Sequence, residues 1–132
     1  MTMPNFLILG AAKSGTTALY AYLKQHPDIY MSAVKEPRFF AFENETLNFK
    51  GPKGHGDRFN QETITDLKTY QSLFDDVDGE KAIGEASPAY LSSAEKASER
   101  IKYYIPDAKL IAILRQPAER AYSAFLHTVR SG

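Results

Sequence analysis

A short apolar run, a loop of small residues and a helical pattern follow one another near the start of this chain. Residues 5–9 are largely apolar, as in a strand covered on both faces of a sheet. Residues 10–15 are small apart from Lys13, and apolar residues at helical spacing follow them as far as His26. A strand, a glycine loop and a helix in this order direct backbone N–H groups toward a phosphate. This segment therefore predicts an anion-binding loop.

The spacing within this loop matches a P-loop in part. Gly10, Gly15 and Thr17 stand at P-loop positions, but Thr16 replaces the usual lysine and Lys13 lies three residues earlier. The displaced lysine argues against a P-loop kinase or NTPase, as does the lack of an obvious aspartate ending an apolar strand. The alternative interpretation is a tight turn whose glycines serve close packing alone.

The composition excludes several classes of function. The 132 residues amount to a single domain over 1–132, and 16 basic residues balance 16 acidic ones. This balance predicts no nucleic-acid partner, because no global field attracts the chain to polyanions. The chain has no cysteine, which excludes disulfides and thiolate metal sites, and no apolar run long enough for a membrane span. We therefore expect a cytoplasmic protein.

Strand-like and helical segments alternate along the chain, which predicts an α/β fold with a mainly parallel sheet. Further strands are expected over residues 29–34, 81–85 and 109–114, and helices over residues 65–74, from a Ser92–Glu95 capping box to residue 105, and from Pro117 onward. The apolar stripes expected to face inward are Ala18, Leu19, Tyr22 and Leu23 in the first helix, and Ala121, Tyr122, Phe125 and Val129 in the last.

Residues 43–60 are predicted to form a long surface loop. Gly51, Pro52, Gly54 and Gly56 lie close together there among polar residues. The interpretations left open are a simple connector, a lid and an acceptor-binding loop.

A second candidate anion site follows the strand at residues 109–114. Arg115 comes directly after this strand, at the edge where open α/β sheets place their ligands. Its planar, permanently charged guanidinium suits a phosphate group. Ser123 lies about two turns into the following helix, from where its hydroxyl can add to the same site.

Four ordered motifs together resemble those of the sulfotransferases that use 3′-phosphoadenosine 5′-phosphosulfate (PAPS). Residues 13–17 (Lys-Ser-Gly-Thr-Thr) and 114–123 (Leu-Arg-Gln-Pro through Arg-Ala-Tyr-Ser) are similar to the family's two phosphate motifs. Residues 35–40 and 84–90 resemble the intermediate motifs of its heparan-type and bacterial branch. The resemblance covers residues 5–130 and implies a P-loop-like, three-layer fold.

The resemblance implies a role for each matching residue. Lys13 and the loop backbone would hold the 5′-phosphosulfate, and Lys13 would also neutralise charge on the departing oxygen. The loop residues concerned are Ser14, Gly15, Thr16 and Thr17. Arg115 and Ser123 would hold the 3′-phosphate, and Glu36 would act as general base on an acceptor hydroxyl or amine. The implied reaction is a direct in-line displacement that needs no metal.

The chemistry of Glu36 supports this role independently. Sulfuryl transfer needs a group that accepts the proton of the nucleophile, and the neighbouring Phe39 and Phe40 can desolvate a carboxylate and raise its basicity. The alternative interpretation is a surface Lys35–Glu36 charge pair. The rival bases are His26, His55 and His127, each of which stands alone in the sequence.

Two features depart from the family pattern. Ala86 stands where many heparan-type members have a lysine, so one cation of the site is either missing or supplied from elsewhere, and Glu85 before it can simply anchor a turn. Family members are also usually longer, which predicts an N-terminal portion with an incomplete sheet. Such a portion is expected to self-associate or to need its C-terminal half.

The leading hypothesis is therefore a sulfotransferase that moves a sulfuryl group from PAPS to an acceptor. A non-catalytic nucleotide-binding fragment is the main alternative. The acceptor classes left open are small molecules, lipids, carbohydrates and carrier-bound intermediates.

Overall fold

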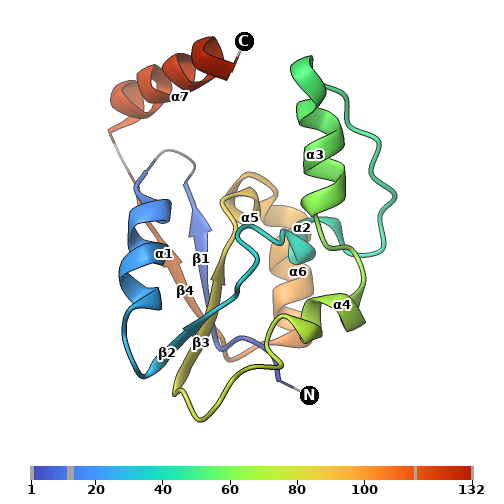
Figure 1. Cartoon of the computed structure of the whole chain (residues 1–132), viewed down its shortest axis with the longest axis vertical. Coiled ribbons are helices and arrows are strands. Elements are labelled where there is room, and N and C mark those ends of the chain that lie inside the picture. The colour runs from blue at the N-terminus through green and yellow to red at the C-terminus, as the bar shows by residue number, and fades with distance from the viewer. Residues whose placement is uncertain (1, 12–13, 115, 132) are drawn as a thin grey trace.

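The computed structural model describes residues 2–11, 14–114 and 116–131, and it confirms the predicted α/β fold with a parallel sheet. Four strands pair in the order β2-β3-β1-β4, all in parallel (Figure 1). The strands are β1 (Phe6–Gly10), β2 (Ile29–Met31), β3 (Ala82–Ala86) and β4 (Lys109–Ala112).

Helices cover both faces of the sheet and make three layers (Figure 1). They are α1 (Thr16–Lys24), α2 (Phe39–Phe42), the 3-10 turn η1 (Pro52–Gly54), α3 (His55–Glu62), α4 (Leu67–Ser72), α5 (Ala89–Ser92), α6 (Ala94–Tyr104) and α7 (Pro117–Ser131). On one face Phe6 and Ile8 of β1 pack with Tyr20 of α1. On the other, Leu7 packs with aromatic residues of α2 and α4 and with α6. Alternate side chains of the central strand thus enter the two cores.

The inward face of α1 differs from the predicted one by a small rotation. Tyr20 is buried, whereas the side chain of Tyr22 is 74% exposed and Ala18 is exposed as well. The Tyr20 hydroxyl donates a 2.6 Å hydrogen bond to the carbonyl of Ser32 beyond β2. This long-range bond satisfies the polar end of a buried ring, and spacing alone cannot reveal it.

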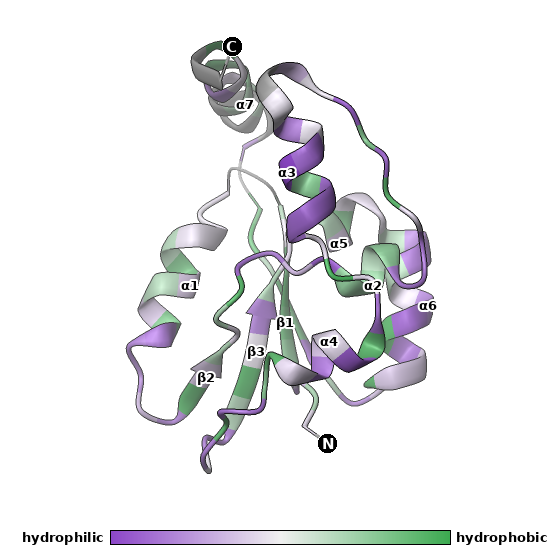
Figure 2. Cartoon of the chain, turned by 45° about the vertical axis from the view of Figure 1, so that its right-hand side comes forward, coloured by the Kyte–Doolittle hydropathy of each residue, from purple (hydrophilic) through white to green (hydrophobic). Residues whose placement is uncertain are grey.

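The predicted loop over residues 43–60 is wrong in its second half, where η1 and α3 form. Gly54 caps α3 in a left-handed conformation (φ 74°), and a Cβ atom at Gly56 would lie 2.3 Å from the carbonyl oxygen of Phe49. The Asn60 side chain bonds both the N–H and the C=O of Phe49. The glycines therefore allow a mostly hydrophilic helix to pack closely on its own connecting segment (Figure 2).

The predicted capping box at Ser92 and Glu95 does not form. Ser92 ends α5, and its hydroxyl donates to the carbonyl of Ala89 at 3.1 Å. Helix α6 begins at Ala94 after Ser93, whose side chain makes no capping bond. Ser92 thus belongs to the single-turn helix α5, whereas the sequence pattern predicted it as the cap of the following helix.

Strand β4 and helix α7 are more exposed than the sequence predicts. β4 lies at the edge of the sheet, and Leu114 just beyond it is 75% exposed. Tyr122, Phe125 and Val129 of the apolar stripe of α7 are also exposed. Figure 1 shows α7 beyond the carboxyl ends of the strands, away from both cores. The apolar stripe of α7 thus lies along the helix as predicted, but the described residues leave it exposed.

The core on the α6 side contains a carboxylate. Glu85 of β3 is fully buried, and its Oε2 accepts hydrogen bonds from the hydroxyls of Tyr70 (2.8 Å) and Tyr90 (2.5 Å). Its Oε1 accepts a bond from the Ser87 hydroxyl at 2.8 Å. Burial raises the pKa of the Glu85 carboxyl above its ordinary value of 4.5, while the three hydroxyl donors act in the opposite direction. Both tyrosines keep their protons because burial and then the Glu85 charge raise each pKa well above 10.0.

The raised pKa of Glu85 predicts how stability changes with pH. The folded state holds the Glu85 proton more tightly than the unfolded state does. The contribution of this proton to the free energy of unfolding is therefore complete below the ordinary pKa of 4.5, and it is lost as pH rises through the pKa of the folded state. We expect the unfolding free energy of the wild type to fall relative to that of Glu85→Gln across this window. Urea denaturation of both proteins at a series of pH values measures the difference, and a constant difference would contradict the prediction.

The exposed apolar residues of β4 and α7 predict self-association of the 132-residue chain. Burying a large apolar side chain contributes about 1.5–3 kcal/mol, so Phe125→Ser should weaken the association by at least about tenfold. Sedimentation velocity over a concentration series measures this effect. Tyr103→Ser is the matched control, because it removes an exposed aromatic ring from α6. A monomeric wild type, or equal effects of the two variants, would refute the prediction.

Candidate active site

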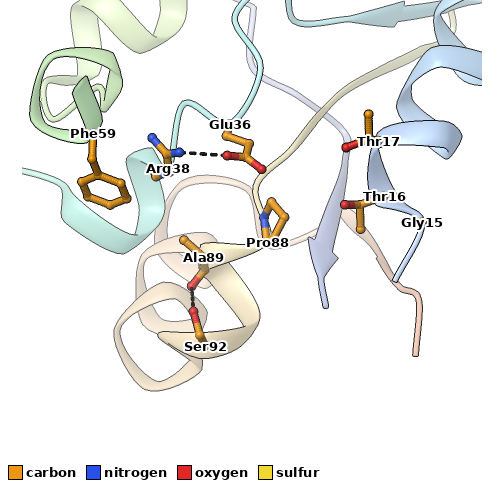
Figure 3. A pocket seen from close by; sticks show the side chains of 9 residues that line it. All are labelled: Gly15, Thr16, Thr17, Glu36, Arg38, Phe59, Pro88, Ala89 and Ser92. Atoms are coloured by element: carbon orange, nitrogen blue, oxygen red, sulfur yellow. Dashed lines mark hydrogen bonds and ion pairs between the residues drawn. The ribbon is translucent and has the colours of Figure 1, made fainter. Parts of the chain in front are cut away.

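A cavity of about 340 Å³ lies where β1 and β3 end (Figure 3). This is the edge at which open α/β sheets bind ligands. Three segments line it: the start of α1, the turn before α2 and the start of α5, joined by one side chain of α3. The lining residues are Gly15, Thr16, Thr17, Glu36, Arg38, Phe59, Pro88, Ala89 and Ser92.

The α1 side of the cavity has the features of an anion site. Gly15 precedes the helix with φ 89°, and neither a side-chain cap nor an acidic residue occupies the first turn. Helix geometry leaves the first N–H groups of α1 without partners inside the helix, and these groups and the positive end of the dipole lie at this end. The Ser14 side chain is 5% exposed, and its hydroxyl has no hydrogen-bond partner among the described residues. Such an orphan costs about 1–3 kcal/mol, so the loop fits a phosphate that would satisfy it.

Glu36 lies on the opposite wall. Its side chain is 34% exposed, and its Oε2 accepts a 2.8 Å bond from the Arg38 guanidinium (Figure 3). Its ion-pair partner is therefore Arg38, whereas the sequence suggested Lys35. Phe39 and Phe40 are fully buried in the α6-side core. The Glu36 carboxylate thus remains in contact with solvent, and the Arg38 guanidinium holds one of its oxygens.

Arg38 connects the carboxylate to α3. Its Nη1 donates to the Thr63 hydroxyl at 3.1 Å, and its guanidinium lies 4.3 Å from the centre of the Phe59 ring. The side chain is 12% exposed, which is low for arginine. The sequence signal for the pairing of Arg38 with Glu36 is a cation two residues after a candidate base, because a turn brings such positions together.

The remaining predicted residues lie elsewhere or outside the described part. Lys13 and Arg115 fall outside the described residues; Ser123 is in α7, and its side chain falls outside them. None of the rival bases His26, His55 and His127 lines this cavity. Within the described ranges no three His, Asp or Glu side chains gather to hold a metal, and no helix is long and apolar enough to cross a membrane.

Several sulfotransferases are similar to this chain in sequence, and a solved one is similar in fold as well. A solved sulfotransferase from Alicyclobacillus acidocaldarius superposes with a TM-score of 0.88 at 46% identity over 99% of this chain. The membrane-associated sulfotransferase kil1 of Dictyostelium discoideum is 33% identical over 98% of the chain, and a mouse bifunctional heparan sulfate N-deacetylase/N-sulfotransferase 4 is 37% identical over 95%. Human carbohydrate sulfotransferase 15 is 31% identical over 98%.

The chain spans part of each relative. It covers 52% of the solved sulfotransferase, 24% of kil1, 13% of the heparan sulfate enzyme and 28% of carbohydrate sulfotransferase 15. The profile of the sulfotransferase family matches residues 4–132. Together with an α1 amino terminus that faces a carboxylate across one cavity, this match shows that the chain belongs to the sulfotransferase family.

Proposed function

We propose that this chain carries the donor loop and the general base of a PAPS-dependent sulfotransferase. The observation that carries the proposal is that the amino terminus of α1 and the Glu36 carboxylate line the same cavity. One wall suits the anionic donor, and the other suits a hydroxyl or amine that must lose a proton. PAPS, when bound, supplies the sulfuryl group that is transferred to this nucleophile.

The α1 wall would bind the 5′-phosphosulfate. The buried Ser14 hydroxyl lacks a partner, and the first N–H groups of α1 are directed to the same end of the helix. Lys13 adjoins Ser14 in the sequence. We assign to Lys13 the neutralisation of the negative charge that develops on the departing oxygen. We assign the 3′-phosphate to Arg115 and Ser123.

Glu36 would accept the proton of the acceptor. Its partly exposed carboxylate borders the cavity, so an incoming hydroxyl or amine can reach it. The 2.8 Å ion pair with Arg38 fixes one carboxylate oxygen, and the other is left to face the acceptor. A single oriented oxygen suits in-line attack, which demands close alignment of the nucleophile.

Carbohydrates are the acceptors to test first. Two relatives carry names that refer to heparan sulfate and to carbohydrate. The cavity wall formed by Arg38 and Phe59 combines a cation with an aromatic ring, a surface that suits polar rings with apolar faces. Small molecules, lipids and carrier-bound acceptors form the other arms of the screen.

A non-catalytic nucleotide-binding fragment is the second candidate. It is favoured by the observation that the chain spans 52% of the solved sulfotransferase. Donor binding without transfer would identify it.

The proposed donor site predicts selective binding of adenosine 3′,5′-bisphosphate over 5′-AMP and ATP. Arg115→Ala and Ser14→Ala should each weaken binding by about tenfold or more, because each removes a contact to a charged group. Lys68→Ala, which removes an exposed charge from α4, is the matched control. Isothermal titration calorimetry measures all four proteins. Tighter binding of ATP than of the bisphosphate would overturn the assignment.

The proposed base predicts that Glu36→Gln lowers kcat by about 10²–10⁴-fold while bisphosphate affinity is kept. Glutamine keeps the shape of the side chain but cannot take the acceptor proton. Transfer of radioactive sulfate from labelled PAPS to the acceptor panel measures the rate. Glu62→Gln, an exposed position on α3, serves as the control. Equal rates for wild type and Glu36→Gln would remove Glu36 from the mechanism.

A further inference from the structure

We propose that Glu85 is a positioning residue for Glu36, and that it acts through the Ser87 hydroxyl and the backbone N–H of Arg38. The inference rests on the proposed role of Glu36 as the base. Glu85 does not line the cavity, so it has no direct contact with substrate there. Its influence must pass through the turn that carries Glu36.

This turn has a strained backbone. Glu36 and Arg38 both adopt left-handed conformations, with φ of 55° and 59°. A residue with a side chain is strained in this conformation, so surrounding contacts must hold it there. The backbone conformation of Glu36 sets the direction in which its Cα–Cβ bond leaves the turn. Relaxation of the turn would therefore swing the carboxylate away from its present wall of the cavity.

Among the described residues, two hydrogen bonds from distant segments reach backbone groups of this turn. The N–H of Ile64 donates to the carbonyl of the fully buried Pro37 at 2.9 Å. The N–H of Arg38 donates to the Ser87 hydroxyl at 3.1 Å. The first bond comes from the segment after α3, and the second comes from the segment after β3 at the sheet edge. The second bond alone leads to a buried charge.

The Ser87 hydroxyl transmits the influence of that charge. A serine hydroxyl has one proton, and here it is donated to Glu85 Oε1 at 2.8 Å. The serine lone pairs are thereby turned toward the Arg38 N–H. The hydroxyls of Tyr70 and Tyr90 both donate to the other carboxylate oxygen, so Tyr90 still holds that oxygen when the Tyr70 hydroxyl is removed. A chain of hydrogen bonds thus connects the core to the Arg38 N–H in the turn. The 2.8 Å ion pair between Arg38 and Glu36 extends this connection to the Glu36 carboxylate.

The test compares Ser87→Ala with Tyr70→Phe in the 132-residue chain. Both variants delete one hydroxyl from the same buried carboxylate, but only Ser87 contacts the turn. Hydrogen exchange of the Arg38 amide, followed by NMR, reports the link directly. We expect Ser87→Ala to speed this exchange by about tenfold relative to the Leu7 amide of β1, and Tyr70→Phe to leave it unchanged.

Kinetics then separate positioning from general destabilisation. We expect Ser87→Ala to lower kcat by about tenfold or more with KM for PAPS within about twofold, because a misplaced base slows only the chemical step. Tyr70→Phe should change neither constant by more than about twofold. Unchanged Arg38 exchange in Ser87→Ala, or equal kcat losses in the two variants, would overturn the inference. If the wild type transfers no sulfuryl group, the positioning role of Glu85 in transfer is refuted together with the proposed function. The exchange result still decides whether Ser87 holds the turn.

Discussion

The parallel pairing of β1 with β3 is the constraint on which the rest of the structure depends. Leu7 pairs with Glu85 and Ile8 with Ala86, and the N–H of Ser87 extends the ladder to the carbonyl of Ile8. Parallel strands end at the same edge, so the loop before α1 and the turn before α5 meet there. β2 pairs with the other side of β3 and brings the Glu36 turn to the same edge. Three strand ends thus form the walls of one cavity.

The same pairing puts a carboxylate in the core and makes stability and function compete. An isolated buried charge is expensive, and the hydroxyls of Tyr70, Tyr90 and Ser87 reduce that cost without removing it. Burial still raises the pKa of the Glu85 carboxyl above its ordinary value, so part of this cost remains. An apolar residue at this position would avoid that cost, but it could not orient the Ser87 hydroxyl toward the turn. The buried carboxylate therefore lowers stability, and in the proposed mechanism it holds the turn that carries Glu36 in place.

The local features of the fold and site could be predicted from the sequence, and the long-range ones could not. The strand–loop–helix unit at residues 5–26 and the α/β class follow from apolar spacing within each segment. The Arg38–Phe59 contact and the Tyr20–Ser32 bond depend on partners in other parts of the chain, and helix α3 depends on close packing against the segment before it. Gly54 and Gly56 show the reason clearly. Glycine clusters indicate close approach or a left-handed turn, but they do not say whether a loop or a packed helix uses it.

The apolar stripe of α7 shows what periodicity can establish. Tyr122, Phe125 and Val129 recur at helical spacing, which correctly predicted the helix, yet all three side chains are exposed. A stripe specifies that a helix has a face to cover, and it does not specify the surface that covers it. β4 and α7 flank Arg115 in the sequence, and Ser123 lies within α7. The residues proposed for the 3′-phosphate thus belong to the same segment of the sequence as this exposed stripe, so we expect donor affinity and self-association to be coupled in this chain.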